Sequence, residues 1–89
     1  MKYFVYLVKC SDGTYYCGYT NDLDKRIREH NSGDYGAKYT KGRRPVKLIY
    51  NEKYEDRSSA LKREVEIKNL KRSEKEKLFS VQVQKNEPR

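Results

Sequence analysis

Two hydrophobic runs with a short polar interruption occupy the N-terminal part of the chain. Residues 3–10 and 14–20 are rich in Tyr, Val and Phe, and they flank the polar triplet Ser11-Asp12-Gly13. Aromatic and β-branched runs favour strands, and a short loop that contains Asp-Gly is typical of a β-hairpin. The pattern therefore predicts two antiparallel strands joined by a tight turn.

Hydrophobic residues at helical spacing follow the hairpin. Leu23 and Ile27 lie one turn apart, just behind Asp22, whose side chain suits a helix N-terminus. Gly33 is the kind of residue that ends a helix. The first helix is therefore expected over about residues 22–32.

A loop and a third strand are expected next. Residues 32–45 hold four Gly or Pro residues and four basic residues, which predicts a loop. Hydrophobic side chains then alternate at Val46, Leu48 and Tyr50. This alternation predicts a strand over residues 46–54.

Two further helices are predicted from capping residues. Asp56 or Ser58 could cap a second helix that runs to about Leu70. Ser73 with Glu76 three residues later forms a capping box, which predicts a short third helix.

The element order β-β-α-β-α-α indicates the α+β class, with a three-stranded, mostly antiparallel sheet flanked by helices. A chain of 89 residues has room for one modest core. A single domain is therefore expected over residues 1–80. Residues 81–89 lack turn or packing signals and are predicted to form a flexible tail.

Charge changes the expected partner more than the expected fold. The chain has 21 basic and 13 acidic residues, which gives a net charge of +8. This surplus on a small surface favours a polyanion such as nucleic acid, because neutralised phosphates release condensed counterions. Solubility alone is the simpler explanation, so charge by itself leaves both open.

Several other classes of protein are excluded. Cys10 and Cys17 cannot form a metal site or a disulfide framework by themselves. The apolar run from Tyr3 to Val8 is too short for a signal peptide, and no stretch is long enough to span a bilayer. We expect a cytoplasmic protein with no membrane partner and no small-molecule cofactor, and the sequence leaves its oligomeric state open.

Two polar residues share a side of the first predicted helix with its hydrophobic residues. Leu23, Arg26, Ile27 and His30 fall at i, i+3, i+4 and i+7. An arginine beside a buried face is costly unless an anion meets it. This pair therefore indicates an anion site, unless the arginine only snorkels to the rim and the histidine only packs.

Glu64 poses the same problem with opposite charge. It lies near the middle of the face that Ala60, Leu61 and Ile67 form on the second predicted helix. A carboxylate there needs a cation, such as a metal ion or a basic side chain. An ordinary ion pair with Lys68, one turn further on, is the alternative.

Tyr6 and Tyr16, one on each hairpin strand, complete the set of candidate catalytic residues. A tyrosine on a sheet usually serves packing. Together with Arg26, His30 and Glu64, however, the two tyrosines could supply what phosphodiester hydrolysis needs. These needs are an activated water, a Lewis acid and positive charge for the developing anion.

Several short motifs occur in a specific order along the chain. They are Phe4-Val5-Tyr6, Tyr16-Cys17-Gly18, Tyr19-Thr20-Asn21-Asp22-Leu23, Arg26 with His30, Gly36-Ala37-Lys38-Tyr39-Thr40, and Ala60-Leu61-x-x-Glu64. In order and spacing they resemble the GIY-YIG nuclease superfamily, over about residues 3–72. The first motif has lost both residues before its tyrosine, whereas the second keeps tyrosine and glycine. The whole chain is similar to small stand-alone bacterial members.

The resemblance implies a metal-dependent endonuclease that hydrolyses DNA phosphodiester bonds with one divalent ion, Mg²⁺ or Mn²⁺. It implies that Tyr6 activates the attacking water, and that Tyr16 assists it or binds the phosphate. Arg26 would clamp the phosphate, and Glu64 would be the metal ligand. His30 would hydrogen-bond a tyrosine and tune it as a base, because a free tyrosine with a pKa of about 10 is a poor base.

The basic loop is the expected nucleic-acid surface, because it mixes cations with an aromatic ring. Its candidate residues are Lys38, Tyr39, Lys41, Arg43 and Arg44. No groove-reading element is evident, so we expect structure- or single-strand-directed cleavage with little sequence preference, of DNA rather than RNA. A catalytically inactive nucleic-acid-binding module is the alternative. Asn69 could be a further polar group of the site.

The length of the hairpin loop tests whether the two tyrosines can act together. A two-residue turn puts Tyr6 and Tyr16 on opposite faces of the sheet. A three-residue loop with its glycine left-handed pairs Cys10 with Thr14 and puts both tyrosines on one face. We predict a loop of the second kind, which also puts Cys10 and Cys17 on opposite faces and so forbids a disulfide between them.

Overall fold

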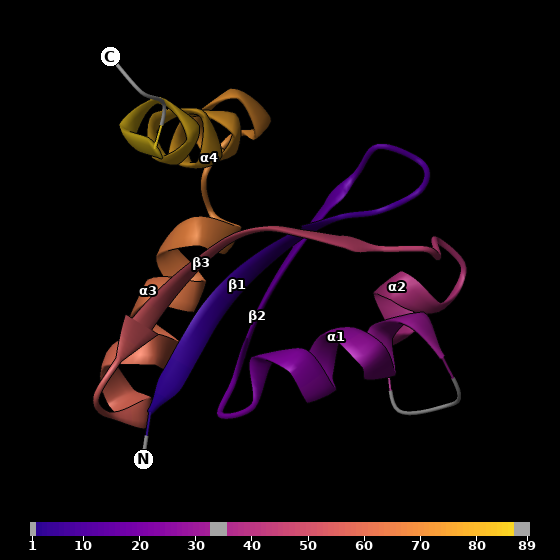
Figure 1. The fold of residues 1–89 in the computed structure, drawn as a ribbon, viewed down its shortest axis with the longest axis horizontal. Coiled ribbons are helices and arrows are strands. Elements are labelled where there is room, and N and C mark those ends of the chain that lie inside the picture. The colour runs from indigo at the N-terminus through magenta and orange to yellow at the C-terminus, as the bar shows by residue number, and fades with distance from the viewer. Residues whose placement is uncertain (1, 33–35, 87–89) are drawn as a thin grey trace.

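The computed structural model describes residues 2–32 and 36–86 and confirms the α+β class (Figure 1). Its elements are β1 (Tyr3–Lys9), β2 (Tyr15–Thr20), α1 (Leu23–Asn31), α2 (Lys38–Lys41), β3 (Lys47–Tyr54), α3 (Arg57–Lys68) and α4 (Arg72–Asn86). Asp22 caps α1 and Asp56 caps α3, each through a carboxylate that accepts a hydrogen bond from a backbone N–H of the first turn.

The three strands form one antiparallel sheet, as predicted, and their order in it is β2-β1-β3. The Cys10 N–H donates to the Thr14 carbonyl at 2.8 Å, and Gly13 has φ 86°. The hairpin therefore has the predicted three-residue loop with a left-handed glycine. Tyr16 pairs with Val8, two residues from Tyr6, so the two tyrosines lie on one face of the sheet.

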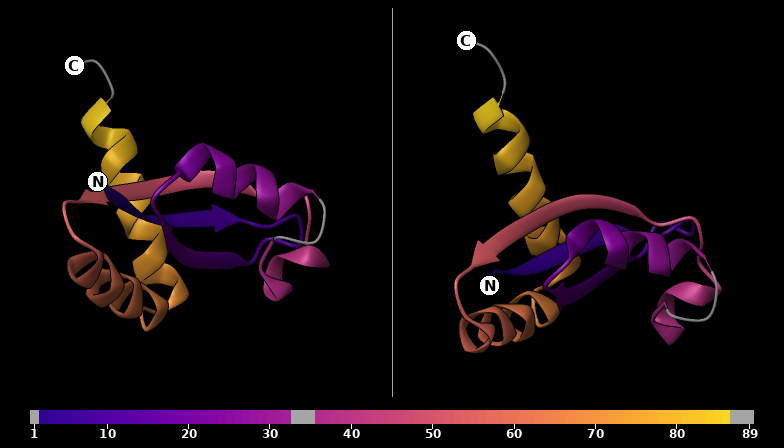
Figure 2. Two further views of the ribbon diagram at one scale, coloured as in Figure 1. Left: turned by 90° about the horizontal axis from the view of Figure 1, so that it is seen from below. Right: turned by 60° about the horizontal axis from the view of Figure 1, so that its bottom comes forward.

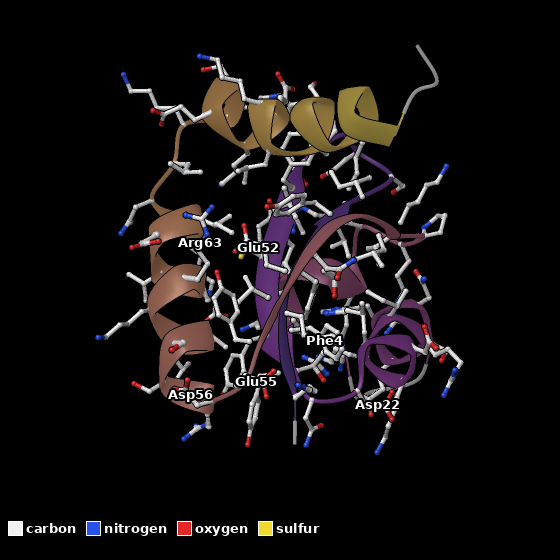
Figure 3. All side chains as sticks on the ribbon, turned by 60° about the vertical axis from the view of Figure 1, so that its left-hand side comes forward. Phe4, Asp22, Glu52, Glu55, Asp56 and Arg63 are labelled. Atoms are coloured by element: carbon white, nitrogen blue, oxygen red, sulfur yellow. The ribbon has the colours of Figure 1, made fainter. Side chains whose placement is uncertain are left out.

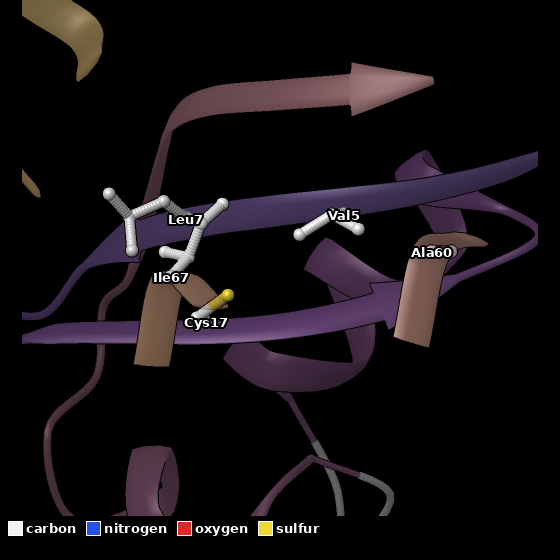
Figure 4. Close-up of a cluster of buried hydrophobic side chains, with 5 residues drawn as sticks. All are labelled: Val5, Leu7, Cys17, Ala60 and Ile67. Atoms are coloured by element: carbon white, nitrogen blue, oxygen red, sulfur yellow. The ribbon is translucent and has the colours of Figure 1, made fainter. Parts of the chain in front are cut away.

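Both faces of the sheet are covered, and each carries its own hydrophobic cluster. Figure 2 shows α1 and α3 on opposite sides of the sheet. The cluster on the α3 side consists of Val5, Leu7, Cys17, Ala60 and Ile67 (Figure 4). The cluster on the α1 side consists of Tyr6, Val8, Cys10 and Val46. The two cysteines are thus free and lie in different clusters, as predicted.

Strand β3 departs from the simple alternation that its sequence indicated. Leu7 of β1 pairs with Tyr50 and the next residue, Val8, pairs with Leu48, so Ile49 is an extra residue in a bulge. The bulge reverses the side-chain alternation. Leu48 packs on the α1 side, whereas Tyr50 packs on the α3 side.

The segment between α1 and β3 contains a short helix. The segment expected to be a loop contains one helical turn, α2, so the element order is β-β-α-α-β-α-α. The Thr40 and Lys41 N–H groups donate to the Ala37 carbonyl, which gives this turn its hydrogen bonds. Gly33, the expected end of the first helix, lies outside the described residues.

The last helix starts earlier and runs further than predicted. The Lys71 N–H donates to the Glu74 carboxylate at 2.8 Å, so Glu74 takes the place that the predicted capping box gave to Glu76. Because residues 81–86 contain neither Gly nor Pro, nothing in the sequence ends the helix there. It continues to Asn86 and points away from the sheet (Figure 2), and the predicted domain boundary at residue 80 stays a prediction.

No helix within residues 2–32 and 36–86 is both long and apolar enough to cross a membrane.

Glu52 joins β3 to α3 through a dense set of hydrogen bonds. The Arg63 Nε and Nη2 groups donate to its two carboxylate oxygens at 2.9 and 3.0 Å. The Tyr54 hydroxyl donates at 2.5 Å, and the Tyr50 hydroxyl donates to the same carboxylate. Figure 3 shows Glu52 and Arg63 facing each other between sheet and helix. This network holds α3, and with it Glu64, against the sheet.

We predict that Glu52→Gln lowers the free energy of unfolding at neutral pH by about 1.5–3 kcal/mol, because it weakens hydrogen bonds to a charged group. Burial raises the pKa of Glu52, but hydrogen bonds from Arg63 and both tyrosines together lower it by more than burial raises it. The pKa of Glu52 therefore lies below its ordinary value. The stabilisation is therefore complete above the unfolded-state pKa and lost as pH falls through the folded-state pKa.

Urea unfolding of wild type and Glu52→Gln at pH values from 3 to 7 would measure this, and Glu55→Gln, at an exposed carboxylate, is the control. The variant should lose stability less steeply on acidification. If the free energy of unfolding depends on acid pH equally in Glu52→Gln and in the wild type, Glu52 does not stabilise the fold through a lowered pKa.

Candidate active site

Tyr6 lies at the centre of β1 with its ring over Gly18, its partner on β2. Only 1% of Tyr6 is exposed. A Cβ atom on Gly18 would come within 2.7 Å of the Tyr6 Cζ atom and closer still to the hydroxyl. The glycine two residues after Tyr16 therefore leaves the space in which Tyr6 lies, which is a physical reason for the Tyr-x-Gly spacing.

His30, in the last turn of α1, is fully buried beside Tyr6. Its Nε2 atom is 2.7 Å from the Tyr6 hydroxyl oxygen, and its Nδ1 atom is 2.9 Å from Thr40 Oγ1 of α2. Burial and then the charge of Arg26 lower the pKa of His30 to about 4, so the ring is neutral at pH 7.

The hydrogen bonds of Thr40 decide where the protons lie in the series of hydrogen bonds that links Tyr6, His30 and Thr40. The Thr40 hydroxyl donates its one proton to the Ala37 carbonyl at 3.0 Å. Thr40 must therefore accept the bond from His30, whose proton is on Nδ1. A neutral imidazole then has a bare Nε2, so the Tyr6 hydroxyl donates to His30. His30 is thereby a proton acceptor for Tyr6.

Arg26 stands one helical turn before His30 and is half-buried. Burial raises the pKa of Tyr6 to about 12, although a hydrogen bond and the charge of Arg26 act in the opposite direction. Arg26 forms an ion pair with Glu29 of the same helix at 3.0 Å. The first helix thus presents a cation to the tyrosine hydroxyl and supplies its own counterion.

Tyr16 is the first of a series of stacked groups that extends from His30 to the surface. Its ring meets His30 edge-on at 5.3 Å between centroids and stacks on Tyr39 at 5.7 Å and 25°. The guanidinium carbon of Arg43 lies 4.1 Å from the centroid of the Tyr39 ring. We call Tyr16, Tyr39 and Arg43 the stacked column.

Glu64 is placed differently from the other candidates, because α3 covers the opposite face of the sheet. Its side chain is only 12% exposed and forms an ion pair with Lys68 at 3.3 Å, the pairing that the sequence left as an alternative. The Cys17 thiol donates to the Glu64 carbonyl at 3.9 Å, which places this turn of α3 beside β2. Burial and then the Glu64 charge raise the pKa of Cys17 to about 12. Cys17 in turn makes a small contribution that raises the pKa of Tyr6.

A metal ion at Glu64 would have few protein ligands. Within residues 2–32 and 36–86, no three His, Cys, Asp or Glu side chains gather in a way that could hold a metal ion. One shielded carboxylate nevertheless fits Mg²⁺, which usually keeps several waters and binds one or two carboxylates together with substrate phosphate.

The basic loop divides into structural and exposed residues. Arg44 donates from Nε to the His30 carbonyl at 2.6 Å, and Arg43 binds Asp12. Lys38 and Lys41 are exposed on α2, beside Tyr39, which is 38% exposed. Asn69, an exposed residue, ends α3, and its backbone N–H donates to the Val65 carbonyl.

Three residues of this arrangement were not identified as functional from the sequence. Glu29 stands three residues after Arg26, a spacing that signals an ion pair on a helix and could have been noticed. Thr40 and Gly18 are part of the sequence motifs, but the motifs alone assign them no function. Their parts depend on contacts across the fold, and no local pattern reveals those.

We predict that Gly18→Ala displaces Tyr6 and breaks its hydrogen bond to His30, at a cost of about 1–3 kcal/mol in unfolding free energy. His30 is the one histidine of the chain, so its ¹⁵N NMR signals report on this bond without overlap. Gly42→Ala is the matched control, because nothing lies within 4 Å of a Cβ atom there. Unchanged His30 signals in Gly18→Ala would refute the close packing.

We predict that His30 stays neutral, with its proton on Nδ1, down to a pH of about 4. Because its pKa lies below the ordinary 6.5, its contribution to stability is complete above pH 6.5 and lost as pH falls toward 4. Thr40→Val should leave the Nδ1 proton without an acceptor and cost about 1–3 kcal/mol. An NMR titration that shows the Nε2-protonated form in the wild type would overturn the proton assignment.

Comparison with known proteins agrees with this fold. Residues 2–77 match the model of the GIY-YIG catalytic domain. A UPF0213 protein of Staphylococcus aureus is 58% identical over 78 residues, 88% of this chain and 94% of its own. One from Halobacterium salinarum is 56% identical over 75 residues, 84% and 96% of the two chains.

A solution NMR structure of a protein from E. faecalis, 41% identical, has a TM-score of 0.65 and covers 100% of this chain and 94% of its own. That of a UPF0213 protein from Bacillus halodurans, 44% identical, has a TM-score of 0.59 and covers 91% and 85%. The chain therefore belongs to the GIY-YIG catalytic domain family.

Proposed function

We propose that this protein is a metal-dependent endonuclease that hydrolyses phosphodiester bonds in DNA, directed to single-stranded or branched structures with little sequence preference. The observation that carries the proposal is the buried hydrogen-bond chain from Tyr6 through His30 to Thr40. Such a chain is more than packing requires, because it aims a bare imidazole nitrogen at a tyrosine hydroxyl that Arg26 also meets.

Tyr6 acts in this proposal as a proton relay. With a pKa of about 12 it is protonated at neutral pH, so it cannot take a proton from water unless it gives up its own. His30 Nε2 is placed to receive that proton, and the Nδ1–H bond to Thr40 keeps the ring in position. A proton then moves from the attacking water to the Tyr6 oxygen, and the tyrosine proton moves to His30.

A bound phosphodiester also changes the charges around this relay. It would exchange with Glu29 as the counterion of Arg26, so that the guanidinium positions the phosphate and stabilises its added charge. Arg26 lowers the pKa of His30 in the free protein. A phosphate beside Arg26 offsets that effect, and His30 accepts a proton more easily with substrate present.

Glu64 would hold one Mg²⁺ or Mn²⁺ with water and phosphate oxygens as its other ligands. When bound, such an ion stabilises negative charge on the phosphate and on the leaving oxygen. The Glu64 carboxylate is shielded from water and has an exposed lysine as its partner, which a doubly charged ion can displace. The pair with Lys68 is the resting state in this proposal.

The expected substrate follows from the surface. A net charge of +8 and the exposed Lys38 and Lys41 favour a polyanionic backbone. The sequence holds no recognisable groove-reading motif, so we expect recognition of DNA structure rather than sequence. The cytoplasm remains the expected setting. An inactive nucleic-acid-binding module is the competing function.

We predict cleavage of single-stranded and branched DNA with Mg²⁺ or Mn²⁺, none with a chelator, and a decrease of roughly 100-fold or more in Tyr6→Phe and in Glu64→Gln. Glu66→Gln, which changes an exposed carboxylate of the same helix, is the control and should keep full activity. Tight DNA binding without cleavage under either metal would instead establish the binding module.

A further inference from the structure

We propose that the outward face of the Arg43 guanidinium is a stacking platform for the base of an unpaired nucleotide next to the cleaved phosphodiester. The inference rests on the proposed function and makes its substrate specific. It goes beyond contact between a basic loop and a phosphate backbone, because it assigns to Arg43 the recognition of a flat aromatic base.

The stacked column connects this platform to the reacting groups. Tyr16 contacts the ring of His30, Tyr39 stacks on Tyr16, and the guanidinium of Arg43 lies over the ring of Tyr39. The side chain of Arg43 is 37% exposed. A base that continues the column would therefore lie one layer beyond Arg43, at the exposed end of the column.

Arg43 is held in place before any ligand arrives. Its Nε donates to Asp12 of the hairpin loop at 3.0 Å, and its Nη1 donates to the Tyr39 carbonyl at 2.8 Å. The Ser11 N–H donates to the Arg43 carbonyl at 2.9 Å, which ties the two loops together. A surface arginine normally loses side-chain entropy on binding, and these bonds have already fixed it.

The same bonds favour a base over a phosphate as the ligand. A phosphate binds an arginine along the edge of its guanidinium, through paired N–H groups. At Arg43, the Nε donor is taken by Asp12 and a Nη1 donor by the Tyr39 carbonyl, and the Asp12 charge offsets the positive charge that would attract a phosphate. These bonds lie in the guanidinium plane and leave its flat face unused, and flat guanidinium faces stack well on nucleobases.

The platform also implies that the base is unpaired. In a duplex each base is stacked on its neighbours, so an incoming planar group finds no open face. A single strand, a flap or a frayed junction provides one, and stacking of this kind is tolerant of sequence. The inference thus gives a physical reason for the structure-directed cleavage that the proposed function expects.

The test measures binding of a branched DNA with a short single-stranded flap by fluorescence anisotropy in the presence of a chelator, with one abasic position moved along the flap. In the wild type, one position should weaken binding by about 5- to 100-fold when its base is absent. In Arg43→Lys, which keeps the charge but loses the plane, the same position should matter less than about 2-fold.

Arg57→Lys is the matched control, because Arg57 also lies over a tyrosine, Tyr19, but on the α3 side of the sheet. It should keep the full abasic penalty. The His30 NMR signals of Arg43→Lys must match those of the wild type, which shows that the neighbouring Thr40 turn is intact.

An abasic penalty that is equal in wild type and Arg43→Lys, or no sensitive position at all, would overturn the platform. Because no metal is present, these outcomes do not depend on cleavage. A positional penalty that depends on Arg43, in a protein that cuts nothing with Mg²⁺ or Mn²⁺, would support the platform and refute the nuclease.

Discussion

Tyr6, His30 and Thr40 have almost no contact with water, so hydrogen bonds within the protein have to replace those that water would make. Each of the three has such a partner, and no buried side-chain nitrogen or oxygen in the described residues lacks one. Because they come from β1, α1 and α2, their bonds also fix those elements against one another. The candidate site and the packing of this half of the molecule are thus one arrangement.

Burial gives this arrangement a neutral resting state. It raises the pKa of the tyrosine and lowers that of the histidine, so both groups lose their tendency to ionise. Arg26 and Glu29, which are charged, lie beside this series of hydrogen bonds, and their opposite charges offset each other. In the proposed function, an anion that replaces Glu29 shifts this balance toward proton transfer. The site would then be inactive until a phosphate occupies it.

The features that the sequence predicted are those set by local geometry. The three-residue loop between Cys10 and Thr14 fixes which residues of the hairpin share a face, and helical spacing placed His30 and Arg26 on the sheet side of α1. The bulge at Ile49 leaves no trace in the hydrophobic pattern, because a single extra residue creates it in an otherwise regular strand. The position of Thr40 was not predictable either, because an irregular segment has no period that assigns a side chain to a face.

Glu64 shows a different limit. Its place on the hydrophobic face of α3 was predictable, and its side chain is indeed shielded, but helical spacing fits a pair with Lys68 and a metal ligand equally well. Topology adds a constraint on the proposed substrate. Since α1 and α3 cover opposite faces of the sheet, a phosphate that meets both Arg26 and a metal at Glu64 has to lie along a sheet edge.

Strand β2 is the edge at which this is possible, because it is the outer strand that carries Tyr16 and Gly18 and because Cys17 bonds to the backbone of Glu64. Gly18 then matters twice in the proposal. It admits the Tyr6 ring on one side, and it adds no side chain to the edge along which the phosphodiester would lie. The short distance across a single strand is what would let residues from opposite faces act on one phosphate.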